Sequence, residues 1–494
     1  MGSGLIEGFV GALSFTNLAY CLLGCLLGTV VGVLPGLGPA ATSAILLPLT
    51  SYMPPAGAII MLAGIYYGAM YGGSTTSILV NVPGEASSVP TCLDGFQMTK
   101  QGRAGEALAI AAIGSFIAGT FGTLALSFLG PALARIGLRF GPPEYFCLVV
   151  FSLTALVSFS EGSLVKGLTT GIAGLFLACI GLDPMSGKQR LTFGIVEFAG
   201  GLDVIAVLMG LFGVAEVLAS AGEGVLHLYK GRLGHLLPRG RELTRGILGS
   251  TQGTITGFLL GLLPGMIPAV TAFIAYDVQK RLSKNPERFG TGCIEGVAAP
   301  EAANNATSQA GFIPLMSLGI PTSPTLAIML AALMMYGLQP GPFLFIQHHA
   351  FAWTVIASMY IGNVILLILN LPLVGLWARL CLIPYRYLGP VILAVCLVGA
   401  FSVRNSLFDV GTCTLFGILG YAMKKRHWPS TPLILGVILG PMLEQSLTQS
   451  LELSGGSLTI LFTRPIALTL LVLTCVLLFL ARKVLRSPKL AHAG

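Results

Sequence analysis

Four polar side chains recur along one face of an Ala-rich segment in the second half of the chain. Glu301, Asn304, Asn305 and Ser308 have the spacing i, i+3, i+4 and i+7 of one helical face. Pro300 suits the first turn of such a helix, whose positive end favours the Glu301 carboxylate. Their oxygens suit a hard cation such as Na⁺, and an intramembrane carboxylate can carry a proton instead. These residues are therefore predicted to couple a cation; helix capping and interhelical hydrogen bonding are the alternative.

A second polar face lies in the first half of the chain. Tyr67, Tyr71, Ser74, Ser77 and Asn81 follow one another at spacings of three or four residues. Hydroxyl and amide groups can hydrogen-bond a carboxylate substrate without burying a cation. The alternative is that these Ser and Thr side chains only form hydrogen bonds between neighbouring helices. The substrate ligands predicted in this region are Ser74, Thr75, Thr76, Ser77, Asn81, Pro83 and Gly84.

Two apolar segments are broken by the same motif, Pro-Gly-x-x-Pro. Gly28–Thr42 and Gly257–Thr271 are identical at eight of fifteen positions, and a weaker pair follows, Asn81–Gly84 and Gly319–Thr322. The chain is therefore predicted to consist of two similar halves, 1–230 and 231–494. The broken hairpins are expected near 28–50 and 246–276.

The breaks themselves point to transport. Proline removes a backbone donor, and in hydrocarbon such a break persists only where it faces protein or an aqueous cavity. Matched breaks in two repeats mark a transporter's midplane site, where half-helix N-termini attract an anion. Helix kinks without a ligand are the alternative. The substrate-binding residues predicted at the breaks are Pro35, Gly36, Gly38, Pro264, Gly265, Gly319, Pro321, Thr322 and Ser323.

Composition places the whole chain in a membrane. Of its 494 residues 54% are hydrophobic and only 9% charged, and the mean hydropathy is +0.86. Soluble domains carry about 25% charged residues. Apolar runs recur along the entire chain, which predicts an all-α polytopic membrane protein with about 10–12 segments.

The net charge of +8 comes from basic residues clustered in loops, so it does not indicate nucleic-acid binding. Short basic loops of membrane proteins face the cytoplasm. The apolar stretch Gly246–Tyr276 lies between two such clusters and is long enough for only one full span, so a hairpin that enters and returns is expected. The two clusters are Lys230, Arg232, Arg239, Arg241 and Arg245, and Lys280, Arg281, Lys284 and Arg288.

Several other classes of function lack their signatures. The sequence has no P-loop, no HExxH and no nucleophile–His–acid arrangement, and its ten cysteines form no CxxC. ATP hydrolysis, intramembrane catalysis and a structural metal are therefore not expected.

An ion pair is expected between Arg404 and Asp409. Asp94, Glu106, Glu144 and Glu197 are expected to cap segments or to lie in loops.

The motifs also resemble a known family. Gly32–Pro39, Tyr67–Ser74, Ile78–Gly84 and Gly261–Gly265 are joined by the long string Phe289–Ala306, with Ala-Pro-Glu-Ala-Ala-Asn-Asn-Ala at its end. With Leu318–Pro321, these stretches are similar to the large membrane subunit of tripartite tricarboxylate transporters, the TctA family. The resemblance runs from about residue 15 to about residue 445.

The resemblance implies uptake of citrate or another di- or tricarboxylate across the bacterial inner membrane. The partners it implies are a small four-helix membrane subunit and a periplasmic solute-binding protein. A Na⁺ or proton gradient would supply the energy, without a cofactor. Thr322 stands where glycine is expected after Gly-Ile-Pro, so the substrate can differ from citrate. A channel-like or ATPase-powered permease subunit for a small organic anion is the alternative.

Overall fold

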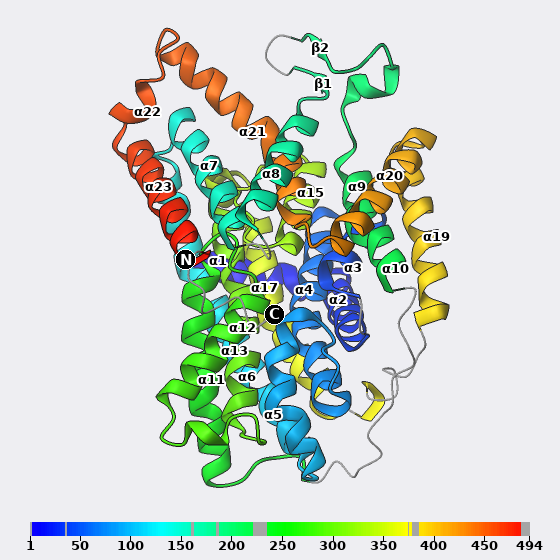
Figure 1. Cartoon of the computed structure of the whole chain (residues 1–494), viewed down its shortest axis with the longest axis vertical. Coiled ribbons are helices and arrows are strands. Elements are labelled where there is room, and N and C mark those ends of the chain that lie inside the picture. The colour runs from blue at the N-terminus through cyan, green and yellow to red at the C-terminus, as the bar shows by residue number, and fades with distance from the viewer. Residues whose placement is uncertain are drawn as a thin grey trace. The chain divides into compact units, whose positions relative to one another are not determined.

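A computed structural model describes residues 2–34, 37–159, 163–183, 187–220, 235–373, 375–377 and 385–485. The fold is almost entirely helical (Figure 1) and divides into two compact units. Unit 1 comprises Met1–Ala134 and Ser220–Val395; unit 2 comprises Arg135–Ala219 and Cys396–Gly494. Each unit draws on both predicted halves, and the boundary between residues 230 and 231 lies outside the described residues. The division into halves stays a prediction.

Unit 1 contains both polar faces and the two short motifs Asn81–Gly84 and Gly319–Thr322. Its helices in the first half are α1 (Gly2–Ala12), α2 (Phe15–Val33), α3 (Pro39–Thr50), α4 (Pro55–Val80), η1 (Ala86–Ser88), α5 (Val89–Lys100) and α6 (Ala104–Gly137), which continues into unit 2. Those in the second half are α11 (Arg241–Gly261), α12 (Pro268–Leu282), η4 (Pro286–Arg288), α13 (Glu295–Ala310), α14 (Phe312–Leu318), α15 (Pro324–Met335), α16 (Pro342–Gln347), α17 (His349–Asn370) and α19 (Tyr385–Arg404), which also continues into unit 2.

Unit 2 is helical apart from one small hairpin. Strands β1 (Gly181–Leu182) and β2 (Gln189–Arg190) pair antiparallel, with Gly181 opposite Arg190. The helices are α7 (Pro142–Phe159), α8 (Leu164–Ala178), η2 (Val196–Gly200), α9 (Val204–Leu208), the π-helical turn η3 (Met209–Val214), α10 (Ala215–Ser220), α20 (Leu407–Lys425), α21 (Thr431–Leu453), α22 (Ile460–Thr463) and α23 (Pro465–Leu485). The predicted Arg404–Asp409 ion pair is confirmed: Arg404 Nε donates to Asp409 Oδ2 at 2.9 Å.

The helices support a multi-pass membrane protein. Within the described residues, four are long and apolar enough to cross a bilayer, judged by length and composition: Phe15–Val33, Pro55–Val80, Ala104–Gly137 and His349–Asn370. Shorter apolar helices accompany them, among them Pro39–Thr50 and Pro324–Met335. The total of about 10–12 segments stays a prediction.

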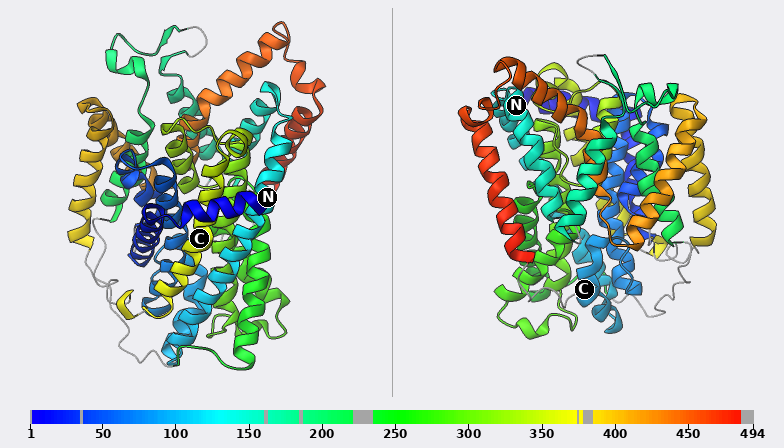
Figure 2. Two further views of the ribbon diagram at one scale, coloured as in Figure 1. Left: turned by 180° about the vertical axis from the view of Figure 1, so that it is seen from behind. Right: turned by 45° about the horizontal axis from the view of Figure 1, so that its top comes forward.

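Both predicted breaks separate two helices. In the second half, α11 ends at Gly261 and α12 begins at Pro268, and the two lie side by side with α13 (Figure 2). In the first half, α2 ends at Val33 and α3 begins at Pro39. Each second helix has proline in its first turn, where the missing N–H costs no helical bond. Pro35 and Gly36 lie outside the described residues.

Glycines bring α2 into backbone contact with α4. A Cβ atom added to Gly28 would lie 2.6 Å from the carbonyl oxygen of Ile65, and one on Gly32 would overlap the carbonyl oxygen of Ala69. Only glycine allows such an approach, as in membrane helix pairs with small residues four apart. The helix that leads into the first break, α2, therefore packs closely against the backbone of α4.

The same packing recurs between α11 and α13. A Cβ atom on Gly257 would overlap the carbonyl oxygen of Ala303, and one on Gly261 would lie 2.7 Å from the Cα atom of Thr307. Gly257 and Gly261 are the sequence counterparts of Gly28 and Gly32. The repeated motif thus builds the same helix contact twice.

Contacts along α5 show that α4 and α13 run in opposite directions. A Cβ atom on Gly73 of α4 would lie 2.5 Å from Ser88 Oγ, just before α5, and Thr99 near the end of α5 donates to the Ile78 carbonyl at 2.7 Å. Residue numbers therefore rise together in α4 and α5.

Against α13 the order is reversed. Thr91 at the start of α5 donates to Glu301, whereas Gln101 after its end donates to the Thr291 carbonyl, before the start of α13. Since α5 is parallel to α4 and antiparallel to α13, the two long helices are antiparallel. That the two halves are inverted repeats stays a prediction, which this antiparallel pair favours.

Candidate functional site

The two short motifs that follow the long helices form matching turns, which we name tip 1 (Asn81–Gly84) and tip 2 (Gly319–Thr322). Asn81 caps α4 with φ 59°, and Gly319 caps α14 with φ 76°. Asn and Gly tolerate this left-handed conformation best, and a proline follows two residues later in each tip. The chain therefore reverses at both tips for the same local reason.

Each tip meets the break of its own half. The amide of Gly265, at the α11–α12 break, donates to the Thr322 carbonyl of tip 2 at 3.2 Å. At tip 1, a Cβ atom on Gly84 would overlap the carbonyl oxygen of Gly32, at the end of α2. The structure thus places Gly265 of the second break against Thr322 of tip 2, whereas tip 1 is described only against Gly32, before the first break. The joint role of these residues stays a prediction. Pro264, Gly38, Pro83 and Pro321 lie in the same breaks and tips.

The four predicted cation-coupling residues lie on α13 and are buried, with Glu301 fully so. Glu301 Oε1 accepts a hydrogen bond from Thr91 Oγ1 at 2.5 Å, and its Oε2 accepts one from Asn304 Nδ2 at 3.2 Å. Asn305 donates to Ser115 Oγ of α6 at 2.8 Å, and Ser308 donates to the Asn305 carbonyl. Glu301 therefore lies among neutral donors.

The prediction that Pro300 stands in the first turn of this helix is wrong. α13 begins at Glu295, so Pro300 and Glu301 lie inside it. The reason is the loop before the helix, which Asp94 of α5 holds in place. The amides of Gly292 and Cys293 donate to Asp94 Oδ1 at 2.9 and 2.7 Å, which lets the helix start directly after them.

Asp94 thus differs from the expected cap or loop charge. It lies inside α5, is fully buried, and also accepts from the Gly290 amide and from the Tyr276 hydroxyl at 2.9 Å. A carboxylate with several backbone donors is a strong clamp between elements. In the same loop, burial and the hydrogen bond to Glu295 raise the pKa of the Cys293 thiol to about 12, so the thiol is neutral at physiological pH.

Three residues beside tip 1 were missed by sequence reasoning: Glu85, Ser87 and Ser88. The Ser87 hydroxyl donates to Glu85 Oε1 and accepts from Asn304 Nδ2 at 3.2 Å. A carboxylate directly after Pro-Gly, in a region almost free of charge, is the signal that could have identified Glu85.

The serine and threonine hydroxyls of this part of α4 donate to their own helix, whereas the Tyr71 hydroxyl of the second polar face donates to Asn363 Oδ1 of α17 at 2.6 Å. Ser74 donates to the Tyr71 carbonyl at 2.8 Å, and Thr76 and Ser77 donate to the Gly73 carbonyl. These three side chains and Thr75 are buried, whereas Asn81 at the end of α4 is exposed. Their role as substrate ligands stays a prediction, and it requires the hydroxyls to rotate away from these carbonyls.

Tip 2 is tied to the long helix of the first half. Ser323 Oγ accepts from the Leu326 amide at 3.4 Å, which caps α15, and lies 3.1 Å from the Tyr66 hydroxyl of α4. At tip 1 the corresponding link is Asn304 of α13 with Ser87. α4 and α13 therefore each contact the segment that directly follows the tip of the other half.

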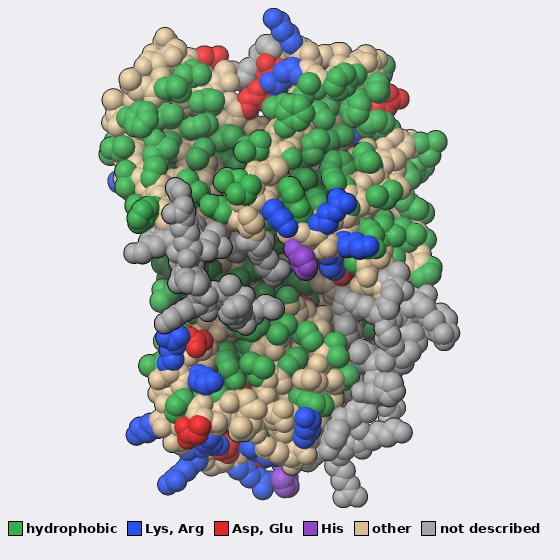
Figure 3. All heavy atoms as spheres, viewed as in Figure 1, with side chains coloured by type: hydrophobic (Ala, Val, Ile, Leu, Met, Phe, Trp, Pro, Cys, Tyr) green, Lys and Arg blue, Asp and Glu red, His purple; other side chains and the backbone are tan. Residues whose placement is uncertain are grey.

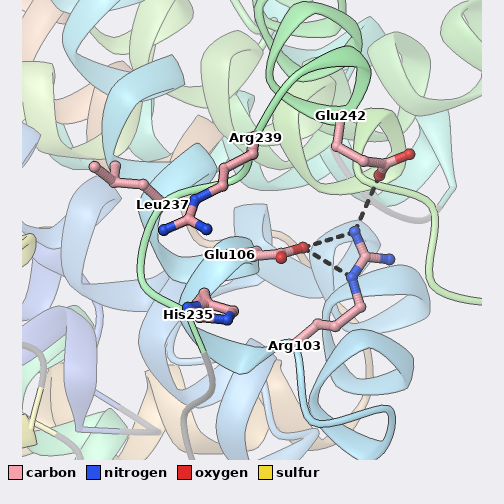
Figure 4. Close-up of a pocket in the computed structure, with 6 residues that line it drawn as sticks. All are labelled: Arg103, Glu106, His235, Leu237, Arg239 and Glu242. Carbon is pink, nitrogen blue, oxygen red and sulfur yellow. Dashed lines mark hydrogen bonds and ion pairs between the residues drawn. The ribbon is translucent and has the colours of Figure 1, made fainter.

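A separate hollow of about 370 Å³ lies at the end of unit 1 where α6 and α11 begin (Figure 4). Arg103 donates to Glu106 at 2.8 Å and to Glu242 at 3.0 Å. His235 and Arg239 line the same hollow. Figure 3 shows Lys, Arg, Asp and Glu side chains gathered at this end of unit 1, with hydrophobic side chains away from it. The arrangement fits a water-exposed loop region.

Comparison with known proteins agrees with the architecture. The family model described as "Tripartite tricarboxylate transporter TctA family" matches residues 18–435. An "Uncharacterized 52.8 kDa protein in TAR-I ttuC' 3'region" of Agrobacterium vitis is 46% identical over 487 residues, covering 97% of this chain and 96% of that protein. No solved structure matches.

A second Agrobacterium vitis protein, "Uncharacterized protein in TAR-II ttuC' 3'region", is 47% identical over 212 residues, covering 43% of this chain and 88% of that protein. The family match covers both breaks, both tips and the polar face of α13. The chain therefore belongs to the tripartite tricarboxylate transporter TctA family.

Proposed function

We propose that the chain is the large membrane subunit of a cation-driven system that imports citrate or another di- or tricarboxylate across the bacterial inner membrane. A periplasmic solute-binding protein delivers the substrate, and a small four-helix membrane subunit completes the transporter. Na⁺ or H⁺ is the coupling ion, and no other cofactor is needed. The observation that carries the proposal is the buried Glu301 carboxylate of α13, which hydrogen bonds link through Asn304 to Ser87 beside tip 1.

The breaks and tips supply features suited to an anion. α12 begins three residues after Gly265 and α15 begins two residues after Thr322, so the hydrogen bond between Gly265 and Thr322 brings the starts of the two helices near each other. Helix N-termini carry a partial positive charge and bind carboxylates without a buried cation. The Ser323 hydroxyl and the Thr322 side chain add polar groups at the same place. We therefore assign the substrate carboxylates to this region and to the matching start of α3.

The α13 face supplies features suited to a cation. Glu301 is buried among neutral donors, and no described Lys, Arg or His pairs with it. A buried carboxylate without a counter-ion is costly, so it favours uptake of a cation. Ser87, which follows tip 1, accepts a hydrogen bond from Asn304 of this face, so cation binding here is linked to the position of the segment after tip 1. We propose that the transporter changes its conformation poorly while the cation site at Glu301 is empty, so that substrate transport depends on cation binding.

The test is uptake of labelled carboxylates by vesicles that contain this chain, its small membrane subunit and the binding protein. We expect concentrative uptake of a di- or tricarboxylate that stops when ionophores collapse the Na⁺ and proton gradients. Acetate, which has a single carboxylate, serves as the control substrate. Uptake that survives collapse of both gradients and needs ATP instead would contradict the proposal.

A further inference from the structure

A second carboxylate belongs to the same hydrogen-bonded chain as Glu301. The Ser87 hydroxyl donates to Glu85 Oε1. Asn304 Nδ2 then donates both to Ser87 Oγ and to Glu301 Oε2, each at 3.2 Å. Glu85 and Glu301 are therefore separated by only two side chains, although they are far apart in sequence.

The two carboxylates lack a compensating positive charge. No ion pair in the described part of the chain joins either of them to Lys, Arg or His. Glu301 is fully buried and Glu85 is half-buried. Two negative charges without a cationic partner are unfavourable in such surroundings. A bound cation removes this cost.

An unused oxygen lies beside Glu85. Ser88 is fully buried, and its hydroxyl has no hydrogen-bond partner. A Cβ atom on Gly73 would lie 2.5 Å from Ser88 Oγ and 3.0 Å from Glu85 Cγ, so both side chains face the same point above α4. Leaving a buried hydroxyl without a hydrogen-bond partner is unfavourable. A cation held by Glu85 would give this hydroxyl a partner.

The corresponding place at the other tip is neutral. Ser323 is the first residue after tip 2, as Glu85 is the first residue after tip 1. Ser323 contacts the Tyr66 hydroxyl at 3.1 Å and already caps α15. The acidic pair is therefore a feature of tip 1 and α13 only, and packing of the repeat does not require it.

Other titratable groups near the pair have their own partners. On α5, Cys92 donates to the Ser88 carbonyl at 3.8 Å, and Asp94 accepts from the loop before α13. On α4, Tyr66 is joined to Ser323. Glu85 and Glu301 are thus the groups whose charge is left uncompensated.

We propose that Glu85, Ser88 and Glu301, bridged by Ser87 and Asn304, form one site for a monovalent cation, Na⁺ or H⁺. Glu85 is the second carboxylate of this site. The inference rests on the proposed function and deepens it, because it assigns the coupling ion to the contact between Glu85–Ser88, the segment after tip 1, and α13. An occupied site ties this segment to α13, and an empty one leaves two repelling carboxylates there.

The test measures the thermal unfolding midpoint of the purified full chain. NaCl is titrated against choline chloride at constant ionic strength, and pH is varied separately between 5 and 8. A rise with Na⁺ identifies sodium, and a rise on acidification without a sodium effect identifies the proton. We expect Glu85→Gln to weaken the response at least tenfold, as Glu301→Gln does. The double variant should respond to the ion no less than the less responsive single variant, because both substitutions remove the same site.

Matched variants keep this result interpretable. Glu197→Gln changes an exposed carboxylate of unit 2 and should respond like the wild type. Ser88→Ala should weaken a sodium response severalfold and leave a proton response intact. If Glu85→Gln does not fold, Glu85→Asp, which retracts the carboxylate, should give an intermediate response.

Two outcomes overturn the inference: a wild-type response in folded Glu85 variants, or a wild-type chain that responds to neither ion. This readout needs no substrate and no partner. Failed carboxylate uptake together with a Glu85-dependent ion response would reject the proposed function and leave the cation site standing. Normal carboxylate uptake together with a wild-type ion response in Glu85→Gln would support the proposed function and reject the cation site.

Discussion

Single carboxylates serve opposite purposes on the two neighbouring elements α5 and α13. Asp94 is fully satisfied, because backbone amides and a tyrosine hydroxyl converge on it. Glu301 has only two neutral donors and shares one of them with the chain that leads to Glu85. A fully bonded buried charge fixes structure, whereas an under-compensated one invites a ligand. Asp94 therefore stabilises the fold, and coupling is the role that we propose for Glu301.

The clamp made by Asp94 gives a prediction at this scale. Asp94→Ala leaves the amides of Gly290, Gly292 and Cys293 without their acceptor, so we expect a loss of about 3 kcal/mol or more in stability. Tyr276→Phe removes a single donor and should cost about 1 kcal/mol. Thermal unfolding of both variants in the same detergent measures the difference. Equal midpoints for Asp94→Ala and the wild type would show that the loop is held by other contacts.

Glycine positions decide how the helices pair. Gly257→Ala forces a methyl group onto the Ala303 carbonyl, and Gly28→Ala forces one onto Ile65. Overpacking of this kind costs about 1–3 kcal/mol, and both variants should unfold at lower temperature.

Gly411→Ala in α20 is the matched control, because a Cβ atom there meets no other atom within 4 Å. It should stabilise the helix by about 0.5–1 kcal/mol. A Gly257→Ala protein as stable as Gly411→Ala would mean that α11 and α13 do not pack through their backbones.

The elements show which features could be predicted from the sequence. The spacing of Glu301, Asn304, Asn305 and Ser308 identified one helical face, and the Pro-Gly motifs located both breaks, because these signals are local. The start of α13 could not be predicted, since Asp94, distant in sequence, determines it. Ser87 was missed for the same reason, because its partner Asn304 is brought to it only by the fold, whereas Glu85 could have been identified from its position directly after Pro-Gly.

At the scale of the whole molecule, antiparallel orientation of α4 and α13 answers a question that the repeat alone left open. A repeated sequence is compatible with parallel or inverted halves, and only the order of contacts along α5 distinguishes them. The antiparallel pair favours the prediction of two inverted halves, an arrangement that suits alternating access. Both broken pairs lie in unit 1, so the groups assigned to substrate and cation belong to one compact unit.

The most direct test of the account compares two transport modes of Glu301→Gln in vesicles with the complete transporter. Exchange of labelled for unlabelled carboxylate needs only substrate binding and alternating access, whereas accumulation needs the cation. We predict that Glu301→Gln keeps substantial exchange and loses gradient-driven accumulation at least tenfold, with Glu197→Gln unaffected in both. Accumulation at the wild-type level in Glu301→Gln would contradict the claim that the carboxylate of α13 couples carboxylate uptake to a cation.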